Sequence, residues 1–136
     1  KLKKGIKELV LEAEEVITTV STEEAIELHA NDDESTVFVD IRDIRELERD
    51  GMVPGAIHVP RGMTEFWFDP ESPYHKKSLA DESKTYILYC AAAWRSALTC
   101  KTLNDMGFTN TVHFAEGFNG WKKSGGPIVE KPSRKN

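Results

Sequence analysis

Short runs of β-branched and aromatic residues alternate with helix-forming segments along most of the chain. Residues 36–40 (TVFVD) and 84–89 (KTYILY) are nearly continuous apolar runs, which is typical of strands buried on both faces of a sheet. Shorter runs at residues 16–20, 56–59 and 111–114 predict further strands. Because helix-type segments separate most of these runs, the pattern predicts an α/β fold with a doubly wound, mostly parallel sheet. Functional sites in such folds lie at the carboxyl ends of the strands.

Capping and stop residues mark the ends of the expected helices. Ser21 and Glu24 have the spacing of a capping box, and Asp43 is placed to cap the next helix. Gly107 follows an apolar helical pattern and predicts its end. The expected helices cover approximately residues 21–29, 43–49, 95–106 and 118–123.

An amphipathic helix is also expected at the amino end. Leu2, Ile6, Leu9, Val10 and Ala13 recur at helical spacing and form one apolar stripe. The stripe fits packing on the same chain and packing on a second subunit equally well, so a homodimer stays open. We therefore expect a helical extension over residues 1–15, one domain over residues 16–129 and a charged tail over residues 130–136.

Residues 60–83 show no regular hydrophobic period, although they include a group of aromatic side chains. A connection of this length is long for so small a domain. The rings are expected to close the core beneath a surface loop, and the alternatives are a substrate lid or a dimer contact. The aromatic residues are Phe66, Trp67, Phe68 and Tyr74.

The composition, 39% apolar and 30% charged, is that of a soluble globular protein. No window approaches the roughly 18 consecutive apolar residues of a membrane-spanning helix, so no membrane partner is expected. The net charge is −5 and no basic stripe is interleaved with aromatic residues, which argues against nucleic acid as a partner. Two cysteines are too few for a disulfide framework, which predicts free thiols and a cytoplasmic location. Since the chain starts at Lys1, an earlier targeting segment stays an open question.

The candidate reactive residue is Cys90, which ends the strand with the clearest pattern. A helix follows closely, so the thiol would face unpaired main-chain N–H groups and the positive end of a helix dipole, and both favour a thiolate. Small side chains at residues 91–93 let the backbone curl around the sulfur, and Arg95 adds a permanent cation. Cys90 is therefore the expected catalytic residue. The residues expected to bind substrate are Ala91, Ala92, Ala93, Trp94, Arg95 and Ser96.

Other polar and sulfur-containing residues fit structural roles better. Cys100 lies on the following helix and is expected to pack, with a resolving thiol as the less favoured alternative. Asp40, Arg42 and Asp43 are expected to pair with one another or to cap a helix. Three scattered histidines lack the spacing of metal ligands, so neither a metal nor a cofactor is expected. They are His58, His75 and His113.

Four motifs in a fixed order resemble those of the rhodanese family of single-domain sulfurtransferases. They are residues 39–43 (VDIRD), 51–56 (GMVPGA), 90–96 (CAAAWRS) and 116–121 (EGFNGW), and the resemblance spans about residues 17–128. It implies a rhodanese-like five-stranded parallel sheet flanked by helices, with a persulfide on the cysteine during turnover. The chain departs from the family at Met52, where histidine is common, and at Ala93, where glycine is common. Alanine restricts the backbone if that position needs a positive φ.

The resemblance implies a thiosulfate sulfurtransferase-like enzyme. The Cys90 thiolate would take sulfane sulfur from a small anionic donor such as thiosulfate and pass it, as a persulfide, to a thiophilic acceptor such as cyanide or a thiol. One alternative is a persulfide carrier or regulatory rhodanese-like module that acts with a sulfur-relay protein. A remote alternative is a cysteine phosphatase or arsenate reductase; phosphatases of this type have five residues between cysteine and arginine, where this chain has four.

Overall fold

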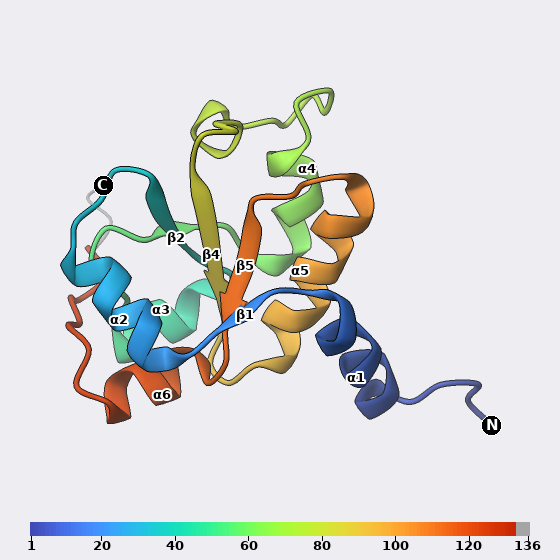
Figure 1. The fold of residues 1–136 in the computed structure, drawn as a ribbon, viewed down its shortest axis with the longest axis horizontal. Coiled ribbons are helices and arrows are strands. Elements are labelled where there is room, and N and C mark those ends of the chain that lie inside the picture. Colours follow the sequence, from blue (N-terminus) through green and yellow to red (C-terminus); the bar gives the residue numbers. More distant parts are fainter. Residues whose placement is uncertain (133–136) are drawn as a thin grey trace.

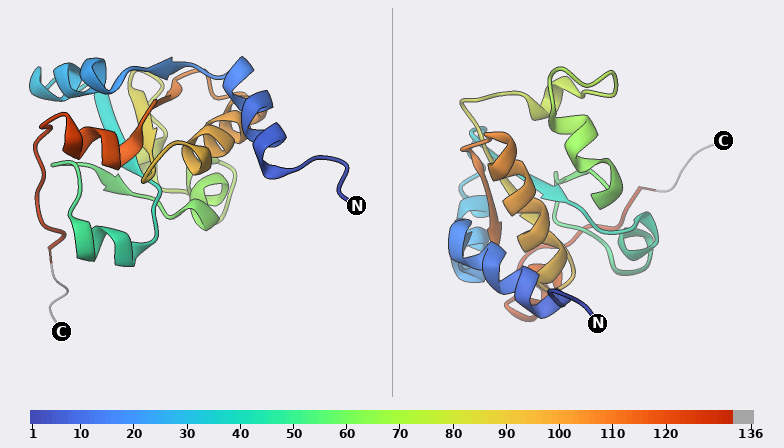
Figure 2. Two further views of the ribbon diagram at one scale, coloured as in Figure 1. Left: turned by 90° about the horizontal axis from the view of Figure 1, so that it is seen from below. Right: turned by 90° about the vertical axis from the view of Figure 1, so that its right-hand side faces the viewer.

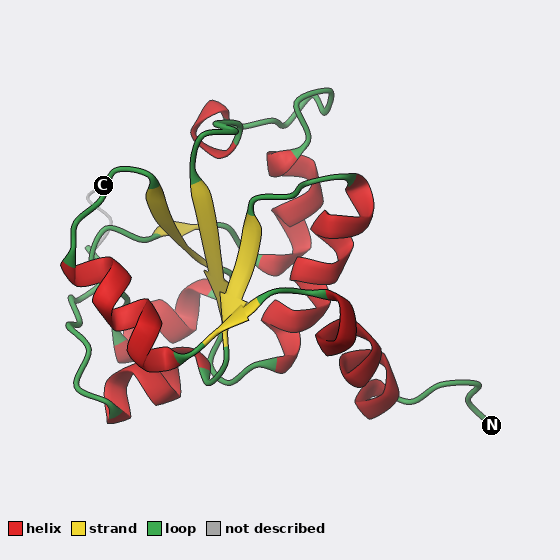
Figure 3. Ribbon diagram, in the orientation of Figure 1, coloured by secondary structure: helices red, strands yellow, loops and turns green. Residues whose placement is uncertain are grey.

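The computed structural model describes residues 1–132, which form a parallel sheet between two layers of helices (Figures 1 and 3). Five strands lie in the order β1-β5-β4-β2-β3, and every neighbouring pair is parallel. The expected rhodanese-like α/β class, with a doubly wound five-stranded sheet, is confirmed. The strands are β1 (Thr19–Val20), β2 (Thr36–Asp40), β3 (Ile57–His58), β4 (Thr85–Tyr89) and β5 (Thr111–Phe114).

Helices cover both faces of this sheet (Figure 2). One apolar cluster joins the sheet to α4 (Thr64–Phe68) and α5 (Trp94–Met106), and a second joins its other face to α2 (Thr22–Ala30) and α6 (Gly117–Lys123). Two further helices are α1 (Ile6–Val16), which packs on α5, and α3 (Ile44–Asp50), which follows β2. Short 3-10 turns cover Arg61–Met63 and Lys77–Leu79.

The side chains of β4 and of Cys90, the residue that follows it, alternate between the two clusters, as the period of a strand requires. Leu88 and Cys90 belong to the cluster beneath α5, whereas Ile87 and Tyr89 belong to the cluster beneath α6. All four side chains are almost fully buried. The alternation therefore fixes the face on which the Cys90 side chain lies, which is the face of the helix that follows it.

The helix-start and helix-end residues expected from the sequence are confirmed, although Ser21 and Glu24 form only one of the two hydrogen bonds of a capping box. The Ser21 hydroxyl accepts the Glu24 N–H at 3.0 Å at the start of α2, and Asp43 and Glu46 form a capping box at the start of α3. Gly107 ends α5 in a left-handed conformation with φ of 111°. Each of these signals depends on neighbours within a few residues, which is why the sequence alone reveals them.

The strand expected over residues 16–20 is wrong in its first three residues. Val16 is the last residue of α1, and the strand β1 consists of Thr19 and Val20 alone. The helix extends this far because Val10, Ala13 and Ile17 continue one helical stripe against Ala97 of α5. Packing of that stripe thus outweighs the β-propensity of a short β-branched run.

The segment over residues 60–83 contains the helix α4, which its lack of period did not predict. Five residues are too short to show a helical repeat in sequence. The expectation that the rings close the core holds for Phe68, which is fully buried, and in part for Trp67, which packs against the same cluster. Phe66 and Tyr74 instead lie exposed against each other, with ring centroids 6.3 Å apart.

At the ends of the chain, α1 packs on the domain through Val10 and Ala13, which are both buried. Of the charged tail expected over residues 130–136, residues 133–136 lie outside the described residues. Within residues 1–132, no helix has both the length and the apolar character needed to cross a bilayer.

Candidate active site

Cys90 directly follows β4, and α5 begins four residues later at Trp94. Its side chain is 1% exposed and belongs to the apolar cluster on the face of the sheet that α5 covers. The sulfur itself has polar neighbours, because Cys90 Sγ accepts the Ser96 N–H at 3.4 Å and lies 3.6 Å from Ser96 Oγ. The buried thiol thus lies beneath the first turn of a helix, where main-chain N–H groups lack helical partners.

The loop that joins Cys90 to α5 needs no left-handed residue. Ala93 caps the helix with φ of −151°, and the non-glycine residue with positive φ in the described chain is Asp32. The alanine that replaces the family's common glycine therefore introduces no backbone strain. Within residues 1–132, the N–H that reaches the sulfur is that of Ser96, and no N–H of residues 91–95 donates to it. Those five groups also bond no other protein acceptor in this part of the chain, so they are available to a ligand.

The start of α6 holds the base of this loop. The Phe118 N–H donates to the Cys90 carbonyl oxygen at 2.8 Å, and the Asn119 N–H donates to the Ala91 carbonyl oxygen at 2.9 Å. Gly117 has φ of 61°, and a Cβ at this position would overlap the carbonyl oxygens of Cys90 and Ala92. Glycine is thus required here both by its torsion angle and by close backbone contact.

Arg95 is held by Glu46 of α3, a residue that the sequence did not single out. Its guanidinium donates to Glu46 Oε2 at 2.8 Å and to Glu46 Oε1 at 3.0 Å. The hydrogen bonds from Arg95 lower the pKa of Glu46, and the Glu46 carboxylate in turn raises the pKa of Arg95. The capping box was the available signal, since the same Glu46 carboxylate accepts the Asp43 N–H at 3.1 Å.

A comparison with models of protein families matches the part of the chain that contains the Cys90 loop. A family model described as a rhodanese-like domain matches residues 21–124, which is most of the chain. The matched segment includes Cys90 and the residues named above that contact it. The chain belongs to the rhodanese-like domain family. The cysteine loop, the turn at Gly117 and the capping box of α3 all lie inside the matched segment of this rhodanese-like domain.

Several known proteins are similar to this rhodanese-like domain. "Putative sulfur carrier protein YrkF" of Bacillus subtilis is 28% identical over 98 residues, which cover 72% of this chain and 48% of that protein. The chain thus spans about half the length of that relative. "Dual specificity phosphatase Cdc25" of Arabidopsis thaliana is 26% identical over 121 residues, which cover 82% of this chain and 77% of the plant protein.

Two solved structures extend the comparison. A Rhodopseudomonas palustris protein of unknown function, described as a possible tyrosine phosphatase, has 46% identity and a TM-score of 0.91, covering 95% of this chain and 97% of its own. The polysulfide-sulfur transferase homodimer of Wolinella succinogenes has 27% identity and a TM-score of 0.70, covering 90% of this chain and 85% of its own. Sulfur transfer and phosphatase descriptions therefore both occur among the similar proteins.

Ser96 connects the cysteine of this rhodanese-like domain to a histidine that the sequence treated as isolated. Ser96 Oγ lies 2.8 Å from His113 Nδ1 on β5, and His113 Nε2 lies 3.0 Å from Thr19 Oγ1 on β1. Burial lowers the pKa of His113 to about 4, so the ring is neutral at physiological pH. The histidines have no metal-ligand spacing in sequence, and no group of three metal-ligating side chains occurs within the described residues.

The remaining residues singled out in the sequence have the expected structural surroundings. Arg42 and Asp40 form a buried ion pair at 2.7 Å, and the guanidinium also lies 4.2 Å from the Phe118 ring centroid. Cys100 is buried, its Sγ lies 3.4 Å from the Thr111 carbonyl oxygen, and burial raises its pKa to about 11. Such a thiol is poorly suited to resolve a disulfide.

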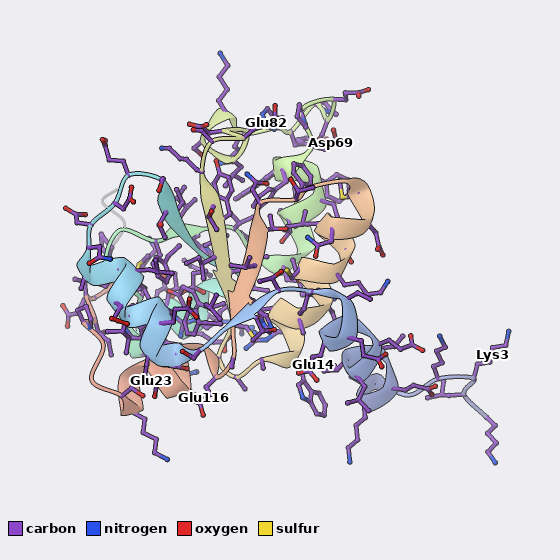
Figure 4. The ribbon with its side chains drawn as sticks, in the orientation of Figure 1. Lys3, Glu14, Glu23, Asp69, Glu82 and Glu116 are labelled. Carbon is purple, nitrogen blue, oxygen red and sulfur yellow. The ribbon has the colours of Figure 1, made fainter. Side chains whose placement is uncertain are left out.

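The rim of the site is formed by exposed residues. Trp94 is 46% exposed at the start of α5, next to the loop that holds Cys90. Acidic side chains occur at both ends of the molecule: Figure 4 shows Glu14, Glu23 and Glu116 toward the carboxyl ends of the strands, and Asp69 and Glu82 at the other end.

Proposed function

We propose that this rhodanese-like domain transfers sulfane sulfur through a persulfide on Cys90. The observation that carries the proposal is the position of Cys90 Sγ beneath the first turn of α5, where it accepts the Ser96 N–H. A helix start with unpaired N–H groups stabilises an anionic sulfur. The unpaired N–H groups of residues 91–95 add donors for the outer sulfur of a persulfide or for an oxyanion.

The proposed reaction has two displacement steps. The Cys90 thiolate attacks the outer sulfur of thiosulfate, a new S–S bond forms, and the bond to the sulfonate sulfur breaks with its electron pair leaving as sulfite. The enzyme then carries a Cys90 persulfide anion. Cyanide attacks the terminal sulfur and leaves as thiocyanate, or a thiolate attacks it and leaves as a persulfide, and either restores the Cys90 thiolate.

We assign the binding of the donor to residues 91–96. In this proposal the amides of Ala91, Ala92 and Ala93 donate to the charged donor, while Arg95 contributes positive charge from its place beside Glu46. Trp94 forms an exposed wall that contacts the donor or an incoming partner. The reaction as written needs no metal ion and no organic cofactor.

The test is thiocyanate formation from thiosulfate and cyanide by the wild type and two variants. Cys90→Ser is expected to abolish turnover, because a hydroxyl cannot form the persulfide. Cys100→Ser is the matched control and is expected to keep at least half of the activity, because Cys100 is buried away from the loop and its hydrogen bond can be kept by serine. Turnover that survives in Cys90→Ser contradicts the proposal.

A persulfide carrier is the second candidate, and it is supported by the Bacillus subtilis relative that is named as a sulfur carrier. A carrier uses the same persulfide but waits for a sulfur-relay protein to discharge it. Steady-state kinetics separate the two functions. An enzyme turns over many equivalents of thiosulfate with cyanide, whereas a carrier accepts one sulfur per chain and then stops.

Phosphatase chemistry is the third candidate, because two of the similar proteins carry phosphatase descriptions. Here four residues separate Cys90 from Arg95, which makes a smaller ring of amides than the five-residue loop of cysteine phosphatases. A smaller ring suits a single sulfur atom better than a tetrahedral phosphate. We expect no hydrolysis of a phosphotyrosine analogue above the rate of the Cys90→Ser variant, and Cys90-dependent hydrolysis at a rate exceeding sulfur transfer would reverse this ranking.

A further inference from the structure

A series of hydrogen-bonding groups extends from the cysteine loop across α5, β5 and β1. Cys90 Sγ lies 3.6 Å from Ser96 Oγ, Ser96 Oγ lies 2.8 Å from His113 Nδ1, and His113 Nε2 lies 3.0 Å from Thr19 Oγ1. Ser96 and His113 are at most 1% exposed, whereas Thr19 lies at the surface. Among the described residues, the side-chain polar atoms buried from solvent all have a hydrogen-bond partner.

The Ser96 hydroxyl has one proton and three neighbouring acceptor or donor atoms. These are Cys90 Sγ, His113 Nδ1 and the Ala93 carbonyl oxygen, which lies at 3.2 Å. If His113 Nδ1 lacks a proton, Ser96 must donate to it and has no proton left for the sulfur. If Nδ1 carries the proton, it donates to Ser96 Oγ, and the hydroxyl can turn toward the sulfur.

The surface end of the series favours the second arrangement when the sulfur is charged. His113 is neutral because burial lowers its pKa to about 4, so the ring carries a single proton on one of its two nitrogens. With that proton on Nδ1, Nε2 accepts the Thr19 hydroxyl proton, and every polar atom of the series is paired. An anionic sulfur is a stronger acceptor than the neutral Ala93 carbonyl oxygen, so it attracts the Ser96 proton.

We propose that His113 is a positioning residue that directs the Ser96 hydroxyl proton toward the Cys90 sulfur whenever that sulfur is an anion. The inference rests on the proposed function in that it assigns the anion to the thiolate and the persulfide of sulfur transfer. His113 touches neither donor nor acceptor and acts through Ser96 alone. No proton leaves the ring, since the tautomer with the proton on Nδ1 is kept throughout the cycle.

Other charged side chains lie on the elements around Cys90, and the variants used in the titration leave all of them unchanged. Their positive and negative charges affect the titration of the sulfur independently of His113. These groups are Arg95 on α5, Glu46 on α3, the Asp40 and Arg42 pair at the end of β2, and Glu116 before α6.

The test is the pH titration of the Cys90 thiolate by its ultraviolet absorbance, in a Cys100→Ser background so that one thiol absorbs. The double variant Cys90→Ser, Cys100→Ser provides the baseline. His113→Leu removes both ring nitrogens at similar volume, so Ser96 Oγ loses the Nδ1–H that leaves its own proton free for the sulfur. We expect the midpoint of thiolate formation to move upward by about half a unit to one unit, the size of one ordinary hydrogen bond. His113→Asn places an amide N–H where Nδ1 lies, and we expect the wild-type midpoint to be restored within about a quarter of a unit.

Two further variants distinguish the loss of the His113 hydrogen bonds from a general disturbance of the structure by the substitution. Thr19→Val removes the donor to Nε2 at the protein surface, where folding is not at risk, and we expect a smaller upward shift of the same midpoint. In a Ser96→Ala background, His113→Leu is expected to cause no additional shift. An unchanged midpoint in both His113→Leu and Thr19→Val contradicts the inference, and so does a His113→Asn variant as shifted as His113→Leu.

The titration uses no sulfur donor, so its outcome is independent of sulfur transfer. If the midpoints shift as expected while thiosulfate gives no persulfide, the positioning role stands and the proposed function fails. If the wild type forms a persulfide while the midpoints stay unchanged, the proposed function stands and the role of His113 fails.

Discussion

At the scale of single residues, the site combines the buried sulfur of Cys90 with the partly exposed guanidinium of Arg95, whose charge is partly balanced by the carboxylate of Glu46. Arg95 donates both of its terminal nitrogens to Glu46, in a two-point contact that only the planar guanidinium can make. The pair fixes where the positive charge of Arg95 lies relative to the loop. Orientation, rather than charge alone, is therefore the contribution of Arg95 that a variant can isolate.

Arg95→Lys keeps the charge and removes the two-point contact with Glu46. We expect kcat/KM for thiosulfate to fall about tenfold, which corresponds to about 1.4 kcal/mol of lost transition-state stabilisation, with little change in the free energy of unfolding. Steady-state kinetics and denaturant unfolding measure the two effects. Arg45→Lys is the matched control, because Arg45 pairs with Asp43 on the exposed side of α3, and equal losses in both variants would argue against this role of Arg95.

His113 gives the folded protein a pH dependence of its own. Its pKa is lowered by burial to about 4, below the value of about 6.5 in the unfolded chain. As the pH falls from about 6.5 to about 4, the unfolded chain binds a proton that the folded chain does not, so the free energy of unfolding decreases, by about 3 kcal/mol at most. Above this window the residue contributes no pH dependence.

The measurement is chemical unfolding of the wild type and His113→Asn at several pH values. The variant lacks the buried ring, so the difference in unfolding free energy between the two proteins is expected to change across this window and to be constant above pH 7. A difference that is the same at pH 5 and pH 7 contradicts the assignment of a neutral, buried His113.

At the scale of secondary structure elements, the amino end of α6 supports the cysteine loop from below. The Phe118 and Asn119 N–H groups hold the Cys90 and Ala91 carbonyl oxygens, and Gly117 leaves room for this contact. Gly117→Ala is expected to cost about 2 to 4 kcal/mol of stability through its positive φ and its overlap with the loop, and to reduce sulfur transfer at least tenfold.

The matched control for this variant is Gly62→Ala. Gly62 has no atom within 4 Å of the position of a new Cβ and lies in the short 3-10 turn Arg61–Met63. We expect its stability to change by less than about 0.5 kcal/mol and its activity to stay at the wild-type level. Thermal unfolding and thiosulfate kinetics of both variants decide the matter, and a fully active, stable Gly117→Ala protein would show that α6 does not support the loop.

The packing of α1 on α5 belongs to the same scale. Val10 is buried against Ala97, whereas Leu11 on the same helix is 62% exposed. Val10→Ala is expected to destabilise the protein by about 1 to 2 kcal/mol, and Leu11→Ala by less than about 0.5 kcal/mol. If sedimentation instead shows that Leu11→Ala dissociates a dimer, α1 serves an interface between copies of the chain.

At the scale of the whole molecule, what could be predicted from sequence depends on the distance between partners along the chain. The cysteine at a strand end, the helix that follows it and the caps at Ser21 and Asp43 all involve neighbouring residues, and each was predicted. The partners of Arg95 and Ser96 lie 49 and 17 residues away. The capping box of α3 marks Glu46 as a capping residue but not as the partner of Arg95, and no local pattern marks His113, because only the fold brings these residues to the Cys90 loop.

The central claim is that the Cys90 sulfur carries a second sulfur atom during turnover. The most direct measurement is the intact mass of the protein after treatment with thiosulfate and removal of excess donor. The account predicts a gain of one sulfur mass in the wild type and in Cys100→Ser, its loss on addition of cyanide, and no gain in Cys90→Ser. A wild-type mass that stays unchanged, or an added sulfur that persists in Cys90→Ser, would contradict it.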